Sequence, residues 1–181
     1  MEEQQIQAYG KINLSLDVKR KRPDGYHDVC MVMQTVKLHD RIFLKRENTP
    51  GIRLSSNLDF LPTGEDNLMV KAAKLLAEEF SIKDGLSFRL EKRIPVSGGM
   101  AGGSTDAAAV LLLMNQVFSL GLSIEELEKR GERTFPSVYT EVAIFQKVLE
   151  KFLHPFPTYR LVFFSWQNRH FPCLQRLFMK P

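Results

Sequence analysis

A glycine-rich segment is the strongest chemical signal in this sequence. It reads Pro95-Val96-Ser97-Gly98-Gly99-Met100-Ala101-Gly102-Gly103-Ser104-Thr105, and alanines that favour a helix follow it. Glycine lets the backbone approach a ligand closely, and a loop that ends at a helix N-terminus directs free N–H groups and the positive end of the helix dipole at one point. That arrangement binds phosphate. The segment therefore predicts a phosphate-binding loop, with the hydroxyls of Ser104 and Thr105 within reach of phosphate oxygens.

The spacing in this loop differs from the two commonest nucleotide-binding motifs. No lysine follows the last glycine, as a P-loop requires, and the G-x-G-x-x-G spacing of a dinucleotide fold is absent. A tight strand-to-helix turn with Ser104 as the helix N-cap also accounts for the pattern. Four glycines within six residues favour phosphate binding over this simpler alternative.

Two other polar groups are weaker candidates for chemistry. Lys11 and Asn13 share the polar face of a predicted strand, where a solvated lysine on a sheet edge is the simpler interpretation. Tyr26 and His27 follow a Pro-Asp-Gly turn and could stack on a nucleobase and hydrogen-bond to it, although surface Tyr and His are common. Local sequence alone assigns neither group a function.

The hydrophobic periodicity predicts the elements that position these residues. Alternating patterns predict strands at residues 6–20, 29–36, 41–45, 52–54 and 86–90, the first of them half-buried through Ile12, Leu14, Leu16 and Val18. A helical period predicts helices over residues 66–80 and after the glycine loop, and Ser123 with Glu126 predicts a capping box before a third helix that ends near Gly131. Strands that come in a run before the helices favour an α+β domain with a mixed or antiparallel sheet.

Composition excludes several classes of protein. The chain has 181 residues, of which 44% are hydrophobic and 25% charged, as in a soluble globular domain. Residues 131–181 hold seven Lys/Arg and three Glu, which leaves 18 basic and 18 acidic residues in the first 130 and argues against nucleic-acid binding. The longest apolar run, residues 107–114, is too short to cross a membrane. A polar N-terminus and only two cysteines predict a cytoplasmic protein without a metal-ligand cluster.

Four segments together resemble one enzyme family. They read AYGKINLSLDVKRKRPDGYHDV, MQTVKLHDRI, EDNL and IPVSGGMAGGSTDAAA, in this order along the chain. They are similar to the 4-diphosphocytidyl-2-C-methyl-D-erythritol kinases, a family of the GHMP kinase superfamily, over roughly residues 6–130. The glycine loop alone indicates the superfamily, whereas K-R-P-D-G-Y-H together with A-x-x-K-I-N-L indicates this member.

The resemblance implies a fold and a reaction. The fold is the GHMP kinase N-terminal domain, which is related to the second domain of ribosomal protein S5. The reaction uses ATP and Mg²⁺ to phosphorylate the 2-hydroxyl of 4-diphosphocytidyl-2-C-methyl-D-erythritol, a small-molecule substrate of the non-mevalonate isoprenoid pathway. By position, residues 95–105 would cradle the ATP phosphates, Asn67 would lie near the adenine, and Lys11 would be the catalytic lysine. The substrate would be bound by Asn13, Tyr26 and His27. Within the loop, Ser97 and Gly98 stand where Ala-Ala is usual, and Met100 where Leu is usual.

The resemblance stops near residue 130, where the composition also changes. Residues 131–181 contain eight of the 13 Phe, the only Trp and one of the 11 Gly. The family next shows G-S-D-V-P-F-C-V-Y-G-G, whose aspartate is the second catalytic residue, but this chain reads GERTFPSVYTEV.

A shifted reading frame recovers the lost motif. When the last base of each codon is joined to the first two of the next, permitted codon choices turn residues 133–142 into DVPFCVYGG and residues 165–181 into LAKPPFPVSTAAFYEA. The latter resembles the family's later K-P-x-x-x-V-S-T segment. We therefore expect residues 1–130 to be an incomplete ATP-binding domain and residues 131–181 to be an out-of-frame translation. The C-terminal domain and catalytic aspartate would then be absent and the kinase impaired. A divergent but genuine segment, with helical spacing from Val138 to Phe152, is the alternative.

Overall fold

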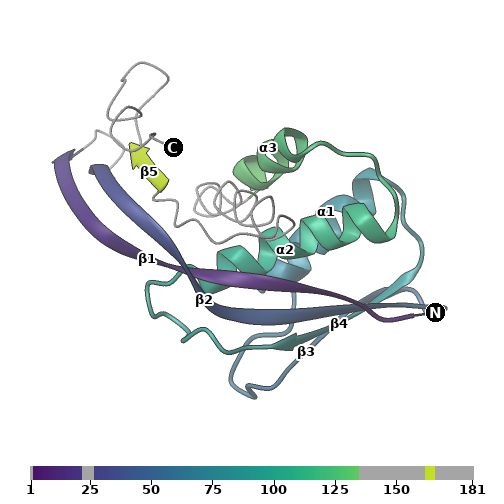
Figure 1. The fold of residues 1–181 in the computed structure, drawn as a ribbon. Helices are drawn as coiled ribbons and strands as arrows, with labels where there is room; N and C mark the ends of the chain where they lie inside the picture. The colour runs from purple at the N-terminus through teal and green to yellow at the C-terminus, as the bar shows by residue number, and fades with distance from the viewer. Residues whose placement is uncertain (1, 22–26, 135–161, 166–181) are drawn as a thin grey trace, which may run out of the picture.

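The computed structural model describes residues 2–21, 27–134 and 162–165. Within these ranges the chain is an α+β domain with a mixed sheet, as the sequence predicts (Figure 1). In chain order the elements are β1 (Gln4–Lys21), β2 (His27–Glu47), β3 (Gly51–Ser56), α1 (Leu68–Glu79), β4 (Gly85–Glu91), α2 (Gly102–Val117), α3 (Ile124–Thr134) and β5 (Val162–Ser165).

The sheet has the order β1-β2-β4-β3, and β5 pairs with β2. β3 runs parallel to β4, and the other pairs are antiparallel. The predicted strands at 29–36 and 41–45 are one continuous strand, β2, because β1 pairs with it along nearly its whole length. Figure 1 shows the helices on one face of this sheet.

The core lies between the sheet and the helices α1 and α2. Leu86, Phe88 and Leu90 of β4 are each 1% exposed, and the alanines and leucines of α2 pack against them. The helix α3 begins with the predicted capping box: Ser123 N–H donates to Glu126 Oε2 at 2.8 Å, and Glu126 N–H donates to Ser123 Oγ at 3.3 Å. The helix ends at Thr134, three residues beyond the predicted end.

The predicted half-burial of the first strand is wrong for its second half. Ile12, Leu14, Leu16 and Val18 are 38%, 54%, 54% and 55% exposed. The pairing of β1 with β2 shifts register between Tyr9 and Lys11 and twice more further along. Figure 1 shows the two strands extending past β3 and β4 and away from the helices, so no described helix covers these side chains.

Most of the segment predicted to be out of frame lies outside the described residues. Its described parts are the end of α3 and the four residues of β5, which pair with residues 30–33 of β2. Among the described helices, none has the length and apolar character that a membrane span requires.

Candidate active site

The glycine loop connects the end of β4 to the N-terminus of α2, as predicted. Positive φ angles at Ser97 (59°), Gly99 (69°) and Ala101 (66°) turn the backbone in alternate directions along the loop. Such alternation directs successive N–H groups into a concavity that favours anions. α2 begins at Gly102, within the glycine-rich segment, and its N-cap is Ala101 rather than Ser104.

The first turn of α2 offers backbone donors that no side chain satisfies. The N-cap Ala101 has no side-chain capping hydrogen bond. Ser104 and Thr105 N–H groups donate to the Ala101 carbonyl at 3.0 and 2.9 Å, whereas the N–H groups of Gly102 and Gly103 precede any intrahelical acceptor. These two amides, at the positive end of a 16-residue helix, suit an anionic ligand.

The two predicted loop hydroxyls have different surroundings. The Thr105 hydroxyl is buried and donates within its own turn, with the Gly102 carbonyl 3.1 Å away, and its contact with a phosphate stays a prediction. Ser104 lines the pocket. The hydrogen bond of the Thr105 hydroxyl therefore stabilises the first turn of α2.

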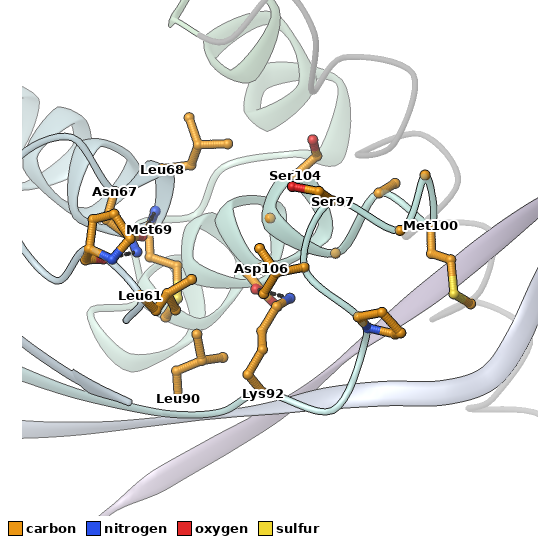
Figure 2. A pocket seen from close by; sticks show the side chains of 18 residues that line it. Leu61, Asn67, Leu68, Met69, Leu90, Lys92, Ser97, Met100, Ser104 and Asp106 are labelled. Carbon is orange, nitrogen blue, oxygen red and sulfur yellow. Dashed lines mark hydrogen bonds and ion pairs between the residues drawn. The ribbon is translucent and has the colours of Figure 1, made fainter. Parts of the chain in front are cut away.

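A pocket of about 350 Å³ opens between the glycine loop and the start of α1 (Figure 2). One end is apolar and is formed by Leu61, Leu68, Met69 and Leu90, and the other end is formed by the loop backbone. The full lining consists of Leu61, Pro62, Asn67, Leu68, Met69, Leu90, Lys92, Pro95, Val96, Ser97, Gly98, Gly99, Met100, Ala101, Gly102, Gly103, Ser104 and Asp106. An apolar end beside an anion-binding end matches the two halves of a nucleotide.

Asn67 lies on the wall of this pocket and also starts a helix. Its side-chain oxygen accepts from Met69 N–H at 2.9 Å, which makes it the N-cap of α1, and its Nδ2 donates to the Pro62 carbonyl at 2.6 Å. Both hydrogen bonds hold the apolar end of the pocket in shape.

Lys11 and Asn13 lie beside the glycine loop. Lys11 Nζ donates to the Gly99 carbonyl at 3.0 Å, and Asn13 Oδ1 is 3.5 Å from the same nitrogen. Lys11 N–H also donates to the Met100 carbonyl at 3.0 Å, so β1 and the loop are directly bonded. His27 begins β2, with only its backbone described, and Tyr26 lies outside the described residues.

Beneath the loop lies a buried ionic cluster that our sequence analysis missed. Lys92, directly after β4, donates to Asp106 Oδ2 at 2.8 Å and to Asp40 Oδ2, and all three side chains are at most 4% exposed. Burial raises the pKa of Asp106 to about 8, although the Lys92 ammonium opposes the shift. Asp106 Oδ1 has no hydrogen-bond partner among the described residues.

Two side chains hold the backbone just before the glycine loop by hydrogen bonds. Asn57 Oδ1 accepts from Lys92 N–H at 2.6 Å, and Asn57 Nδ2 donates to the Lys92 carbonyl at 3.1 Å. Asp40 Oδ1 accepts from the N–H groups of Arg93 and Ile94 at 2.5 and 2.8 Å. The path of residues 92–94 is thus set by side chains from β2 and from the turn after β3.

The comparison with protein families identifies this fold. Residues 67–138 match the model of the GHMP kinases N terminal domain. The described unit is a GHMP kinase N-terminal domain. The matched range contains α1, β4, the glycine loop, α2 and α3.

The chain is similar in sequence to curated proteins that have the same name as one another. The chain is 54% identical over 126 residues to a 4-diphosphocytidyl-2-C-methyl-D-erythritol kinase of Lachnoclostridium phytofermentans, which covers 70% of this chain and 43% of the relative. It is 51% identical over 128 residues to the enzyme of that name from Clostridium beijerinckii, covering 71% and 45%. These matches confirm the resemblance found in the sequence. The chain spans less than half the length of the curated relatives it matches.

Solved structures share this fold. A crystal structure of 4-(cytidine 5'-diphospho)-2C-methyl-D-erythritol kinase matches with a TM-score of 0.64 at 29% identity, covering 80% of this chain and 49% of that one. A mevalonate kinase matches with a TM-score of 0.56 at 17% identity, covering 77% and 47%. At that identity the second likeness concerns the fold alone.

Possible metal ligands in the GHMP domain are its His, Cys, Asp and Glu side chains. Within the part of the chain that the structure describes, no three His, Cys, Asp or Glu side chains gather as a metal site. The described residues therefore form no protein cage for the Mg²⁺ that the resemblance implies, and we assign it no ligands.

Proposed function

We propose that this chain carries the ATP-binding part of a cytoplasmic small-molecule kinase that phosphorylates the 2-hydroxyl of 4-diphosphocytidyl-2-C-methyl-D-erythritol, in isoprenoid synthesis. The observation that carries the proposal is the meeting of Lys11 Nζ with the glycine loop, 3.0 Å from the Gly99 carbonyl. The Lys11 ammonium on β1 thus lies next to the anion-binding glycine loop, which is far from it in the sequence. The names of the relatives support the choice of substrate.

The loop would bind the phosphates and the pocket's apolar end the adenine. The amides of Gly102 and Gly103 and the dipole of α2 would offset the negative charge of the triphosphate. Mg²⁺ would arrive with the nucleotide, since this ion is held largely by substrate phosphates and water.

Lys11 would act on the phosphoryl group in transfer. Its ammonium is within reach of the loop and can exchange the Gly99 carbonyl for a phosphate oxygen, which would stabilise charge as the phosphoryl group moves. Asn13 lies next to it on β1 and would contact the accepting substrate. Tyr26 and His27 are proposed to bind the cytosine on the strength of the resemblance.

We infer that residues from about 131 onward are read out of frame. The shifted frame yields two family-like segments, DVPFCVYGG and LAKPPFPVSTAAFYEA, and the junctions Trp166–Gln167 and Met179–Lys180 allow no choice of residue. The curated relatives match 126 to 131 residues of this chain, which is consistent with a break there. The nucleotide sequence across codons 125–140 tests the inference directly: an open frame that continues GERTFPSV with no deletion or insertion relative to the relatives' genes contradicts it.

One observation favours a second function, which is nucleotide binding with little or no phosphoryl transfer. Residues 131–181 contain no Asp, so the tail has no replacement for the family's catalytic aspartate. The chain as it stands would then bind nucleotide and transfer the phosphoryl group slowly or not at all. Groups that act as a catalytic unit commonly lose orders of magnitude in rate when one is removed.

The experiment compares this chain with a version restored to the DVPFCVYGG frame. Mg-ATP-dependent phosphorylation of the cytidine substrate and ATP affinity are measured for both, together with Lys11→Met in the restored chain. We expect similar ATP affinity, turnover at least about a thousandfold higher in the restored chain, and loss of turnover in Lys11→Met. Equal turnover would contradict the frame inference, and absence of ATP binding by both chains would refute the kinase proposal. A panel with homoserine and mevalonate as acceptors tests the other GHMP kinase activities.

A further inference from the structure

The buried cluster of Asp40, Lys92 and Asp106 has no role in the proposed transfer itself. Its position is nevertheless specific, because Lys92 lies directly beneath the first turn of α2. A Cβ on Gly102 would stand 2.6 Å from Lys92 Nζ and 3.0 Å from Ile94 Cγ2. The close approach of the ammonium is therefore a reason for glycine at position 102.

The cluster connects three separate parts of the domain. Asp40 comes from β2, Lys92 from the end of β4, and Asp106 from the second turn of α2. Figure 2 shows Lys92 and Asp106 joined beneath the loop, facing the pocket. The Lys92 ammonium thus links α2 to the sheet, because it contacts Asp106 of the same helix that contains Gly102 and Gly103.

The charges within the cluster are compatible with an anion above it. An ionised aspartate near the N-terminus of α2 would be repelled by a bound triphosphate. Burial instead raises the pKa of Asp106 to about 8, so near neutral pH its carboxyl holds a proton. The Lys92 ammonium is then balanced by Asp40 alone, and the base of the loop carries no excess negative charge.

Resting on the kinase function proposed above, we propose that Asp106 and Lys92 are positioning residues, which hold the N-terminal amides of α2 in register with the loop so that they bind the phosphates of the nucleotide. The contact between Lys92 Nζ and Asp106 Oδ2 is the tether. The apolar end of the pocket, shaped by Asn67 and α1, is independent of it. Loss of the tether should therefore weaken binding of phosphates and leave binding of the nucleoside unchanged.

The test measures binding of ATP and of adenosine to the full chain and to Asp106→Ala, with Asp106→Asn as the conservative variant. Asp106→Ala leaves Lys92 paired with Asp40, so no buried charge loses its partner. We expect ATP affinity to fall about tenfold, as for the loss of one charge-assisted hydrogen bond, and adenosine affinity to stay within about twofold. The amide oxygen of Asp106→Asn can still accept from Lys92 and should restore ATP binding.

Two further variants separate the tether from general destabilisation. Gly102→Ala breaks the tether from the loop side, because its Cβ displaces the Lys92 ammonium, and it should show the same selective loss if Asp106→Ala does not fold. Asp84→Ala is the matched control. It removes the Arg46–Asp84 ion pair, at 3.1 Å, which joins β2 to the turn before β4 and lies outside the pocket. It should change neither ligand's affinity.

Hydrogen exchange of the amides of residues 98–105 provides a readout that needs no ligand. The tether predicts faster exchange there in Asp106→Ala, with α1 unchanged. A parallel loss of ATP and adenosine affinity, or unchanged exchange in the loop, would overturn the proposal. If the unaltered chain binds neither ligand, the proposed kinase function fails. Exchange alone then decides on the tether: faster exchange supports it and unchanged exchange refutes it.

Discussion

Two strands of this domain have the same alternating pattern but opposite surroundings. In β4, Leu86, Phe88 and Leu90 are 1% exposed, whereas in β1, Leu14, Leu16 and Val18 are 54–55% exposed. β4 lies under the helices and pairs on both sides, with β2 and with β3. The second half of β1 pairs with β2 beyond the helices (Figure 1). Alternation thus predicts a strand, but the neighbouring layer decides whether its apolar face is buried.

The ion pairs of these two regions differ in the same way. Under the helices, Lys92 and its two aspartates are at most 4% exposed, so the buried Lys92 ammonium depends on Asp40 for neutralisation. On the extended half of β1, Lys19 pairs with Asp17, with side chains 56% and 60% exposed. Water screens the second pair and not the first.

The largest expected difference between the regions is in packing. Phe88→Ala should lower the free energy of unfolding by about 3–5 kcal/mol, because it removes a fully buried ring and leaves a cavity. Leu16→Ala, the control on β1, should change it by less than about 1 kcal/mol. Urea unfolding followed by circular dichroism measures both. Equal losses would mean that the exposed face of β1 is packed in solution.

A second difference concerns pH. The pKa of Asp106 is raised in the folded state, to about 8 from 3.8, so folding favours the protonated form. This contribution to stability is complete below about pH 4, decreases as pH rises, and is lost by about pH 8. The free energy of unfolding of the unaltered chain, relative to Asp106→Asn, should fall by a few kcal/mol over that range, on the order that linkage gives.

Urea unfolding at several pH values between 5 and 9 checks this pH dependence, with Asp17→Asn as a control on the exposed strand. A difference between the unaltered chain and Asp106→Asn that stays constant with pH would show that Asp106 is ionised in the folded protein throughout.

The smallest effect is expected at the exposed ion pair. Asp17→Asn removes one partner of Lys19 on β1 and should change the free energy of unfolding by less than about 0.5 kcal/mol at moderate salt. Thermal unfolding at low and high salt measures the change. A loss of 2 kcal/mol or more would place this pair in a buried environment and remove the contrast with Lys92.

The sequence alone determined the local structure and the family. The glycine loop, the capping box of Ser123 and Glu126, and the strand and helix periods follow from propensities and spacings within a few residues, so the order of elements was predictable. The four family-like segments likewise predicted a GHMP kinase N-terminal domain, which the matching family model and relatives confirm. The functional roles of Lys11, Asn67 and the loop remain proposals.

Only the tertiary structure revealed what lies beneath the loop. A signal was present, because Asp40 shares the inward face of β2 with Ile42 and Leu44, and Lys92 continues the inward alternation of Leu86, Phe88 and Leu90. A charged residue at a core position is costly unless a partner meets it. Residues 40, 92 and 106 are far apart in sequence, and only the packing of α2 on the sheet brings them within hydrogen-bond distance. The exposure of β1 and the burial of the Thr105 hydroxyl were decided in the same way, by neighbours that local sequence does not specify.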